Sequence, residues 1–147
     1  LLANAIAHSR FTHRIEYSPF TGPNALQGDA QMLTMVMENL IDNACRYSPT
    51  DSQVVVSLTR ERLVTGATLL LCVRNLPGDA GWPDPARLFE KYYRSAHAQR
   101  QTGSGMGLYL ISGLAEMMGG TLEYEPTNNH VQFVFRLPLT DTSGAVQ

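Results

Sequence analysis

The chain has 147 residues, of which 44% are hydrophobic and 16% are charged. This length and apolar fraction suit one domain built around one hydrophobic core. Eleven basic residues stand against 13 acidic ones, so the formal net charge is -2. No basic stripe could neutralise a phosphate backbone, which excludes a general nucleic-acid binder. Apolar runs such as 69–73 are far shorter than the roughly 20 residues that a membrane span needs.

Cysteine and histidine usage argues against a structural zinc site. Cys45 and Cys72 lie in apolar stretches, where we expect small core residues rather than a disulfide, as in a reducing compartment. The four histidines are scattered without zinc-ligand spacing. The first residues include neither a methionine nor a basic leader, so we expect the sequence to be part of a longer protein.

Hydrophobic periodicity and turn residues predict an alternation of helices and strands. In chain order we expect the tail of a helix over 1–10, a strand over 11–17, a long helix over 29–47, a hairpin of strands 54–58 and 68–73, a short helix over 84–89, a helix over 107–118, and strands over 121–124 and 131–137. Asp29 is the predicted N-cap of the long helix, which Ser48-Pro49 should end. Asp84-Pro85 should start the short helix, and Gly119-Gly120 should close the last one. The pattern predicts an α+β fold with helices on one face of an antiparallel or mixed sheet.

The long helix carries a polar edge beside its apolar stripe. On a helical wheel the stripe consists of Leu33, Val36, Met37, Leu40, Ile41 and Ala44. Asn39, Asn43 and Arg46 follow i, i+4, i+7 spacing on the neighbouring face. Amide oxygens are suitable ligands for Mg²⁺, and arginine pairs with phosphate oxygens. The alternative is a half-exposed polar edge without a ligand.

Two further segments are suggestive but not specific by themselves. Gly103-Ser104-Gly105-Met106-Gly107 lies directly before a helix, where glycines let the backbone approach an anion closely. Phe89–Arg94 combines aromatic and basic residues just before a polar segment. The alternatives are an ordinary glycine turn and aromatic rings that only pad the core.

Taken together and in this order, three segments resemble the boxes of sensor histidine kinases. Residues 38–49 (ENLIDNACRYSP) resemble the N box, 89–94 (FEKYYR) the F box and 103–108 (GSGMGL) the G2 box. The resemblance implies a Bergerat-type two-layer α/β sandwich, with a mixed, mostly antiparallel sheet covered on one face by about three helices. It implies an ATP-binding catalytic domain over 11–140, after the end of a linker helix over 1–10 and before a flexible tail over 141–147.

The resemblance also implies roles for individual residues. Asn43 would hold Mg²⁺ and, with Arg46, count as catalytic. Asn39 and Arg46 would contact the phosphates of ATP, and Tyr47 would line the pocket. The remaining implied ATP-binding residues are Asn75, Phe89, Arg94, Arg100, Gly103, Gly105, Gly107 and Leu108. Residues 95–102 would form an ATP lid, and Arg94 or Arg100 would reach the γ-phosphate when this lid closes.

The sequence departs from the family at the G1 box. Where the family has Asp-x-Gly-x-Gly, this chain has Asn75, Pro77 and Asp79, with Gly78 and Gly81 nearby. An asparagine oxygen still accepts one hydrogen bond, as the adenine amino group requires. The resemblance therefore predicts that Asn75→Asp tightens ADP binding, provided that water reaches the residue.

The implied activity is that of a histidine protein kinase that transfers the γ-phosphoryl group of Mg-ATP. The acceptor would be a histidine on a separate dimerisation domain of the same protein, with a response regulator downstream. His8 and His13 lack the sequence context of such an acceptor. The domain would be cytoplasmic and free of membrane contact, in a parent protein anchored in the inner membrane. Two alternatives stay open: a degenerate regulatory module with weak or no nucleotide binding, and a gyrase-like or anti-sigma ATPase.

Overall fold

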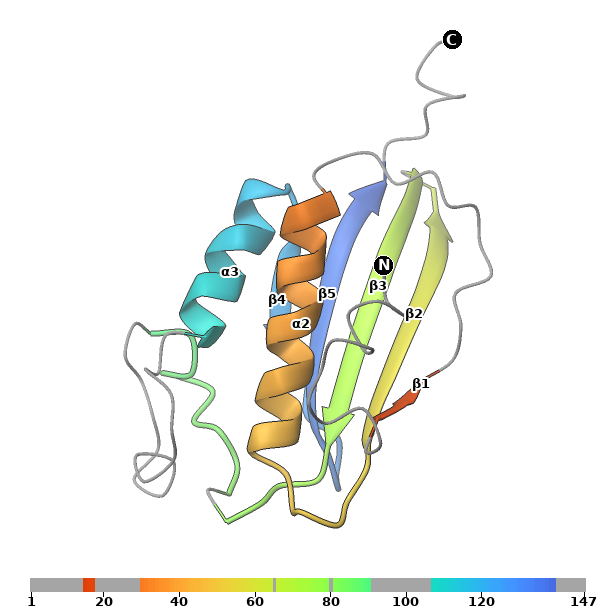
Figure 1. Ribbon diagram of the computed structural model, residues 1–147. Helices are drawn as coiled ribbons and strands as arrows, with labels where there is room; N and C mark the ends of the chain where they lie inside the picture. Colours follow the sequence, from red (N-terminus) through yellow and green to blue (C-terminus); the bar gives the residue numbers. More distant parts are fainter. Residues whose placement is uncertain (1–14, 18–29, 65, 80, 91–106, 140–147) are drawn as a thin grey trace, which may run out of the picture.

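A computed structural model describes residues 15–17, 30–64, 66–79, 81–90 and 107–139. Its elements are β1 (Ile15–Tyr17), α2 (Ala30–Arg46), β2 (Val54–Leu63), β3 (Gly66–Asn75), α3 (Gly107–Met117), β4 (Thr121–Tyr124) and β5 (Val131–Leu139). The strands form one sheet in the order β1-β2-β3-β5-β4, in which only the β1–β2 pair is parallel. The predicted α+β class and the mixed, mostly antiparallel sheet are therefore confirmed (Figure 1).

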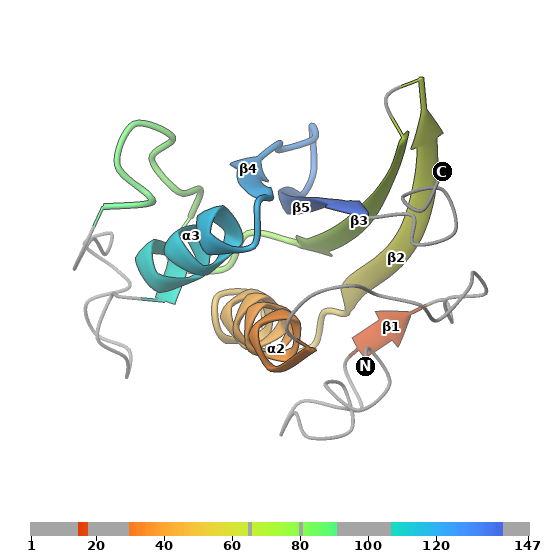
Figure 2. The ribbon, with the colours of Figure 1, turned by 90° about the horizontal axis from the view of Figure 1, so that it is seen from above.

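The hydrophobic core lies between the sheet and two helices that pack side by side on one face of it (Figure 2). Side chains alternate across a strand, so every second residue of β3 from Ala67 to Asn75 faces this core and is buried. From the helix side, all six residues of the predicted apolar stripe of α2 are at most 2% exposed. The periodicity of the long helix thus identified its buried face correctly.

The hairpin of β2 and β3 is longer than predicted. Its register runs from Val55↔Arg74 to Leu63↔Gly66. The outer half of β2 is mostly exposed and carries charged residues, so its composition does not look like a strand. Backbone pairing with the apolar β3 nevertheless continues along it. The predicted N-cap Asp29 lies outside the described residues.

The prediction of a short helix over 84–89 is wrong. The N-cap contact forms, since the Asp84 side chain accepts a hydrogen bond from Ala86 N at 3.0 Å. Arg87 N and Leu88 N also donate to the Asp84 carbonyl, but the segment remains a series of turns. Helix nucleation is costly and needs several consecutive bonds to be offset, whereas here burial of Leu88 anchors the turn. The described residues therefore contain two helices on the sheet rather than about three.

The end of α3 confirms the predicted role of Gly119-Gly120. Gly119 has φ +80° and donates to the Glu116 carbonyl at 3.0 Å, while Gly120 donates to the Ala115 carbonyl at 2.8 Å. These are the two hydrogen bonds of a Schellman motif. Gly120 is also buried, and a Cβ placed there would run into the backbone carbonyl of Arg136.

We expect Gly120→Ala to lower the free energy of unfolding by about 1–3 kcal/mol, because the backbone must move to accept the methyl group. Gly113→Ala is the matched control, since a Cβ at this exposed position of α3 meets no atom within 4 Å. It should raise stability by about 0.5–1 kcal/mol through helix propensity. Urea unfolding measures the stability of both variants. An unfolding midpoint for Gly120→Ala equal to that of the wild type would contradict the close approach of Gly120 to the Arg136 carbonyl.

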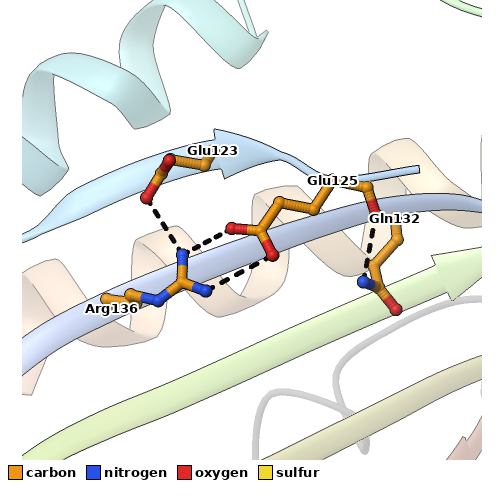
Figure 3. Close-up of polar contacts among 4 residues, drawn as sticks. All are labelled: Glu123, Glu125, Gln132 and Arg136. Atoms are coloured by element: carbon orange, nitrogen blue, oxygen red, sulfur yellow. Dashed lines mark hydrogen bonds and ion pairs between the residues drawn. The ribbon is translucent and has the colours of Figure 1, made fainter. Parts of the chain in front are cut away.

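An ion-pair network lies on the sheet face away from the helices (Figure 3). Arg136 Nη1 contacts Glu123 at 2.9 Å and Glu125 at 2.6 Å, and Gln132 donates to the Glu125 carbonyl at 3.0 Å. The hydrogen bond with Glu125 is the main reason that the pKa of Arg136 is raised. Exposed pairs of this kind contribute about 0.2–1 kcal/mol each, so we interpret the network as joining β4 to β5.

The prediction that the cysteines are core residues is correct for Cys45 and wrong for Cys72, because Cys72 belongs to the row of β3 that faces away from the helices. Cys45 is buried, Cys72 is half-buried on the outer sheet face, and neither forms a disulfide. Burial raises the pKa of the Cys72 thiol, which therefore stays neutral. In the part of the chain that the structure describes, neither helix is long and apolar enough to cross a membrane.

Candidate functional site

The polar edge of α2 is half-buried, as its position beside the apolar stripe requires. Asn39 Nδ2 donates to the Met35 carbonyl one helical turn earlier, at 2.7 Å. The side-chain amide of Asn43 forms no hydrogen bond with any described residue. A half-buried amide of this kind has its oxygen available to a ligand. Its environment therefore fits the predicted metal contact.

Arg46 lies in the last turn of α2. Its Nη2 contacts Asp42 Oδ2 at 3.0 Å, with the two side chains 22% and 42% exposed. The carboxyl end of a helix carries partial negative charge, which stabilises a cation there and disfavours an unscreened phosphate. Phosphate binding next to Asn43, which the resemblance predicts, would therefore require positive charge, such as that of Arg46. A phosphate at this position would compete with Asp42 for the guanidinium.

Asn75 is the buried polar residue of the described chain, at 3% exposure. It is the last residue of β3 and belongs to the row that faces the helices. Its Nδ2 donates to the Leu76 carbonyl at 2.7 Å, whereas no described group donates to its Oδ1. An unsatisfied buried acceptor costs about 1–3 kcal/mol, so a donor from a ligand would be favourable here. The adenine amino group predicted for this position is such a donor.

The loop after β3 uses two glycines that differ in position from the family's G1 glycines. Gly78 N donates to the Tyr47 carbonyl at 3.1 Å, and Gly81 N donates to the Gly78 carbonyl at 2.9 Å. Gly81 has φ +75°, a conformation that other residues rarely adopt. The family pattern predicts glycines at positions 77 and 79, and Gly78 had no predicted role. The sequence signal for Gly78 is a glycine next to a proline, three residues after the last residue of β3.

Phe89 packs against the edge of the core. Its ring meets Phe133 edge to face, with centroids 6.3 Å apart and planes at 75°. Leu108 also packs against the core, and Gly107 is the exposed first residue of α3. The aromatic ring therefore has the packing role that was one of its two interpretations, and its nucleotide contact stays a prediction. Four other predicted site residues lie outside the described residues, as does the predicted lid over 95–102: Arg94, Arg100, Gly103 and Gly105.

The fold brings the predicted base-binding and phosphate-binding parts of the site to one end of the molecule. In Figure 1, α2 and β3 both end at the lower edge, and the loop after β3 runs from there towards the start of α3. No group of three or more His, Cys, Asp or Glu side chains among the described residues could hold a metal ion. The predicted metal contact would combine the amide oxygen of Asn43 with ligand oxygens, a donor set that Mg²⁺ accepts.

The family model of the histidine kinase-, DNA gyrase B- and HSP90-like ATPases matches residues 28–141. The chain belongs to this ATPase family. Within the family, it is 33% identical over 110 residues to the sensor histidine kinase HprS of Escherichia coli, and 34% identical over 113 residues to the kinase/phosphatase MprB of Mycolicibacterium vanbaalenii. The predicted resemblance to sensor histidine kinases is thus confirmed.

The matches cover 75% and 77% of this chain, but only 23% of the length of each of these relatives. Among solved structures, a mycobacterial sensor histidine kinase MprB aligns with a TM-score of 0.72, covering 94% of this chain and 93% of that chain at 24% identity. Full-length ShkA in complex with AMPPNP aligns with a TM-score of 0.71 over 95% of this chain and 29% of its own, at 21% identity. These structural matches establish the fold of the ATPase family.

Proposed function

We propose that this domain binds Mg-ATP and supplies its γ-phosphoryl group to a histidine on a separate dimerisation domain of a sensor kinase. The observation that carries the proposal is the buried Asn75 acceptor, at the end of β3 in a chain of the ATPase family. The names of the relatives HprS and MprB, sensor histidine kinase and histidine-protein kinase/phosphatase, support the transfer to histidine. The complex of ShkA with AMPPNP supports an adenine nucleotide as the ligand.

In this proposal, different residues bind the base, the phosphates and the metal ion of Mg-ATP. Asn75 Oδ1 accepts a hydrogen bond from the adenine amino group, while Asn39 and Arg46 contact phosphate oxygens. The amide oxygen of Asn43 is the protein ligand for Mg²⁺, which neutralises charge on the phosphates when it is bound. Catalysis is then mainly positioning and electrostatic stabilisation, because phosphoryl transfer demands little covalent chemistry of the protein.

The proposed function also implies two protein partners for this domain. The acceptor histidine belongs to the part of the protein that this chain, at 23% of the length of its relatives, does not span. A response regulator then receives the phosphoryl group from that histidine. The domain works in the cytoplasm, where ATP is available, as part of a parent protein anchored in the inner membrane.

We expect the 147-residue chain to bind Mg-ATP and Mg-ADP without phosphorylating itself. The pocket residues are present, whereas neither His8 nor His13 has the context of an acceptor. Calorimetric titration measures the binding, and incubation with γ-labelled ATP measures the transfer. Acid-labile label on the purified chain that disappears in a His8→Ala or His13→Ala variant would contradict the prediction.

The second candidate is a degenerate module of the same fold that regulates by protein contact. It is favoured by Pro77 and Asp79 at positions where the family's G1 box has glycines, since proline has no N–H and aspartate adds negative charge. The calorimetric titration separates the two candidates. Absence of binding at millimolar Mg-ADP would support the degenerate module.

A further inference from the structure

One backbone hydrogen bond joins two parts of the chain that are far apart in the sequence. The N–H of Gly78, in the loop after β3, donates to the carbonyl of Tyr47 at 3.1 Å. Tyr47 directly follows α2, so its carbonyl is among the last ones of the helix, which have no partner within the helix itself. The loop therefore supplies the partner that this helix end needs.

Only glycine fits at this contact. A Cβ on Gly78 would lie 2.6 Å from the Tyr47 carbonyl oxygen and 3.2 Å from the Ser48 carbonyl carbon. Both of these are backbone atoms, so no side-chain rotation relieves the clash. Positive φ is not the reason for the glycine, in contrast to Gly81, which has φ +75° and open space around it. The requirement at Gly78 is close approach between two backbones.

The contact lies between the two parts of the proposed nucleotide site. On the α2 side, the Asn43 carbonyl accepts a hydrogen bond from Tyr47 N at 3.2 Å, and Arg46 is the neighbouring residue. On the loop side, Asn75 precedes Gly78 at the end of β3. The hydrogen bond between Gly78 and Tyr47 is therefore a direct backbone contact between the α2 part and the loop part of that site.

We propose that Gly78 is a positioning residue for nucleotide binding, which sets the spacing between Asn75 and the polar edge of α2 through its contact with the Tyr47 backbone. This inference rests on the proposed function. It assigns to Gly78 a part in affinity beyond its part in folding. Trp82, the single tryptophan of the chain, lies in the same loop at 44% exposure and reports on the position of that loop.

The test compares Gly78→Ala with Gly120→Ala. Both variants force a methyl group against a backbone carbonyl, but Gly120 lies at the junction of α3 and β4, away from the loop. We expect both to lower the melting temperature. Only Gly78→Ala should bind Mg-ADP about tenfold more weakly and shift the Trp82 emission of the nucleotide-free protein, because a misplacement of the ligand groups weakens binding. Gly120→Ala should keep the wild-type emission and an affinity within about twofold.

A wild-type Mg-ADP affinity in folded Gly78→Ala would overturn the inference and leave Gly78 with a purely structural part. Failure of the wild-type chain to bind Mg-ADP would overturn the proposed function, and the inference with it. If Gly78→Ala does not fold, hydrogen exchange of the Gly78 amide in the wild-type protein decides. The amide should be protected in the free protein and exchange about tenfold more slowly with saturating Mg-ADP. Fast exchange of the Gly78 amide in the free protein, or an exchange rate that Mg-ADP leaves unchanged, would overturn the inference.

Discussion

Asn43→Ala is expected to abolish Mg²⁺-dependent nucleotide binding while the domain stays folded. The half-buried side chain lies beside the apolar stripe of α2 and forms no hydrogen bond with the described residues, so its truncation removes little packing. The free energy of unfolding should change by no more than about 1 kcal/mol, because alanine also favours the helix. Calorimetric titration with ADP, with Mg²⁺ and with a chelator, measures the binding, and urea unfolding measures the stability.

Glu38→Ala is the matched control for this variant. Glu38 is an exposed residue of the same helix, for which we propose no contact with the metal. It should keep the wild-type affinity for Mg-ADP and the wild-type dependence on Mg²⁺. Wild-type Mg-ADP affinity in Asn43→Ala would show that the metal assignment is wrong. Unfolding of the Asn43→Ala variant would show that the residue is structural.

Asn75→Asp is expected to weaken Mg-ADP binding and to destabilise the fold, the reverse of the prediction from the G1 box. That prediction required water around the residue, and Asn75 is only 3% exposed. Its Nδ2 donates to the Leu76 carbonyl at 2.7 Å, where a carboxylate would place an oxygen against an oxygen. Loss of this buried bond costs about 1–3 kcal/mol, and a buried unpaired charge adds to that cost. A tenfold loss of affinity corresponds to about 1.4 kcal/mol, so the effect on binding should be at least of that order.

The measurement is the dissociation constant for Mg-ADP together with the urea midpoint, at one salt concentration. Asp79→Asn is the control, because it also exchanges an amide and a carboxylate near this loop, with a charge change of one unit in the opposite direction at an exposed position. Its affinity should stay close to that of the wild type. Tighter binding by Asn75→Asp would show that the carboxylate reaches the adenine amino group free of the Leu76 carbonyl, as the family comparison first suggested.

Local patterns accounted for much of the fold. The spacing of Leu33, Val36, Leu40 and their neighbours identified the buried face of α2, because helical periodicity depends only on positions a few residues apart. The glycine pair after α3 was predicted for the same reason, since a Schellman motif involves one turn of chain. The predicted N-cap contact of Asp84 formed as well. The helix expected after it did not, because the burial of Leu88 in the core decides that segment.

The candidate site also has features that the local sequence determined and features that only the tertiary structure decided. The sequence by itself determined which residues of α2 share a polar edge, and the i, i+4 spacing of Asp42 and Arg46 already allowed their ion pair. Only the tertiary structure decided that Asn75 is buried with its amide committed to Leu76, and that Gly78 contacts Tyr47. The burial of Asn75 and the contact of Gly78 both depend on how the end of β3 packs against the end of α2, two segments distant in the chain. Periodicity and turn chemistry report on neighbours along the sequence, and so they contain no information about which backbone atoms meet across that distance.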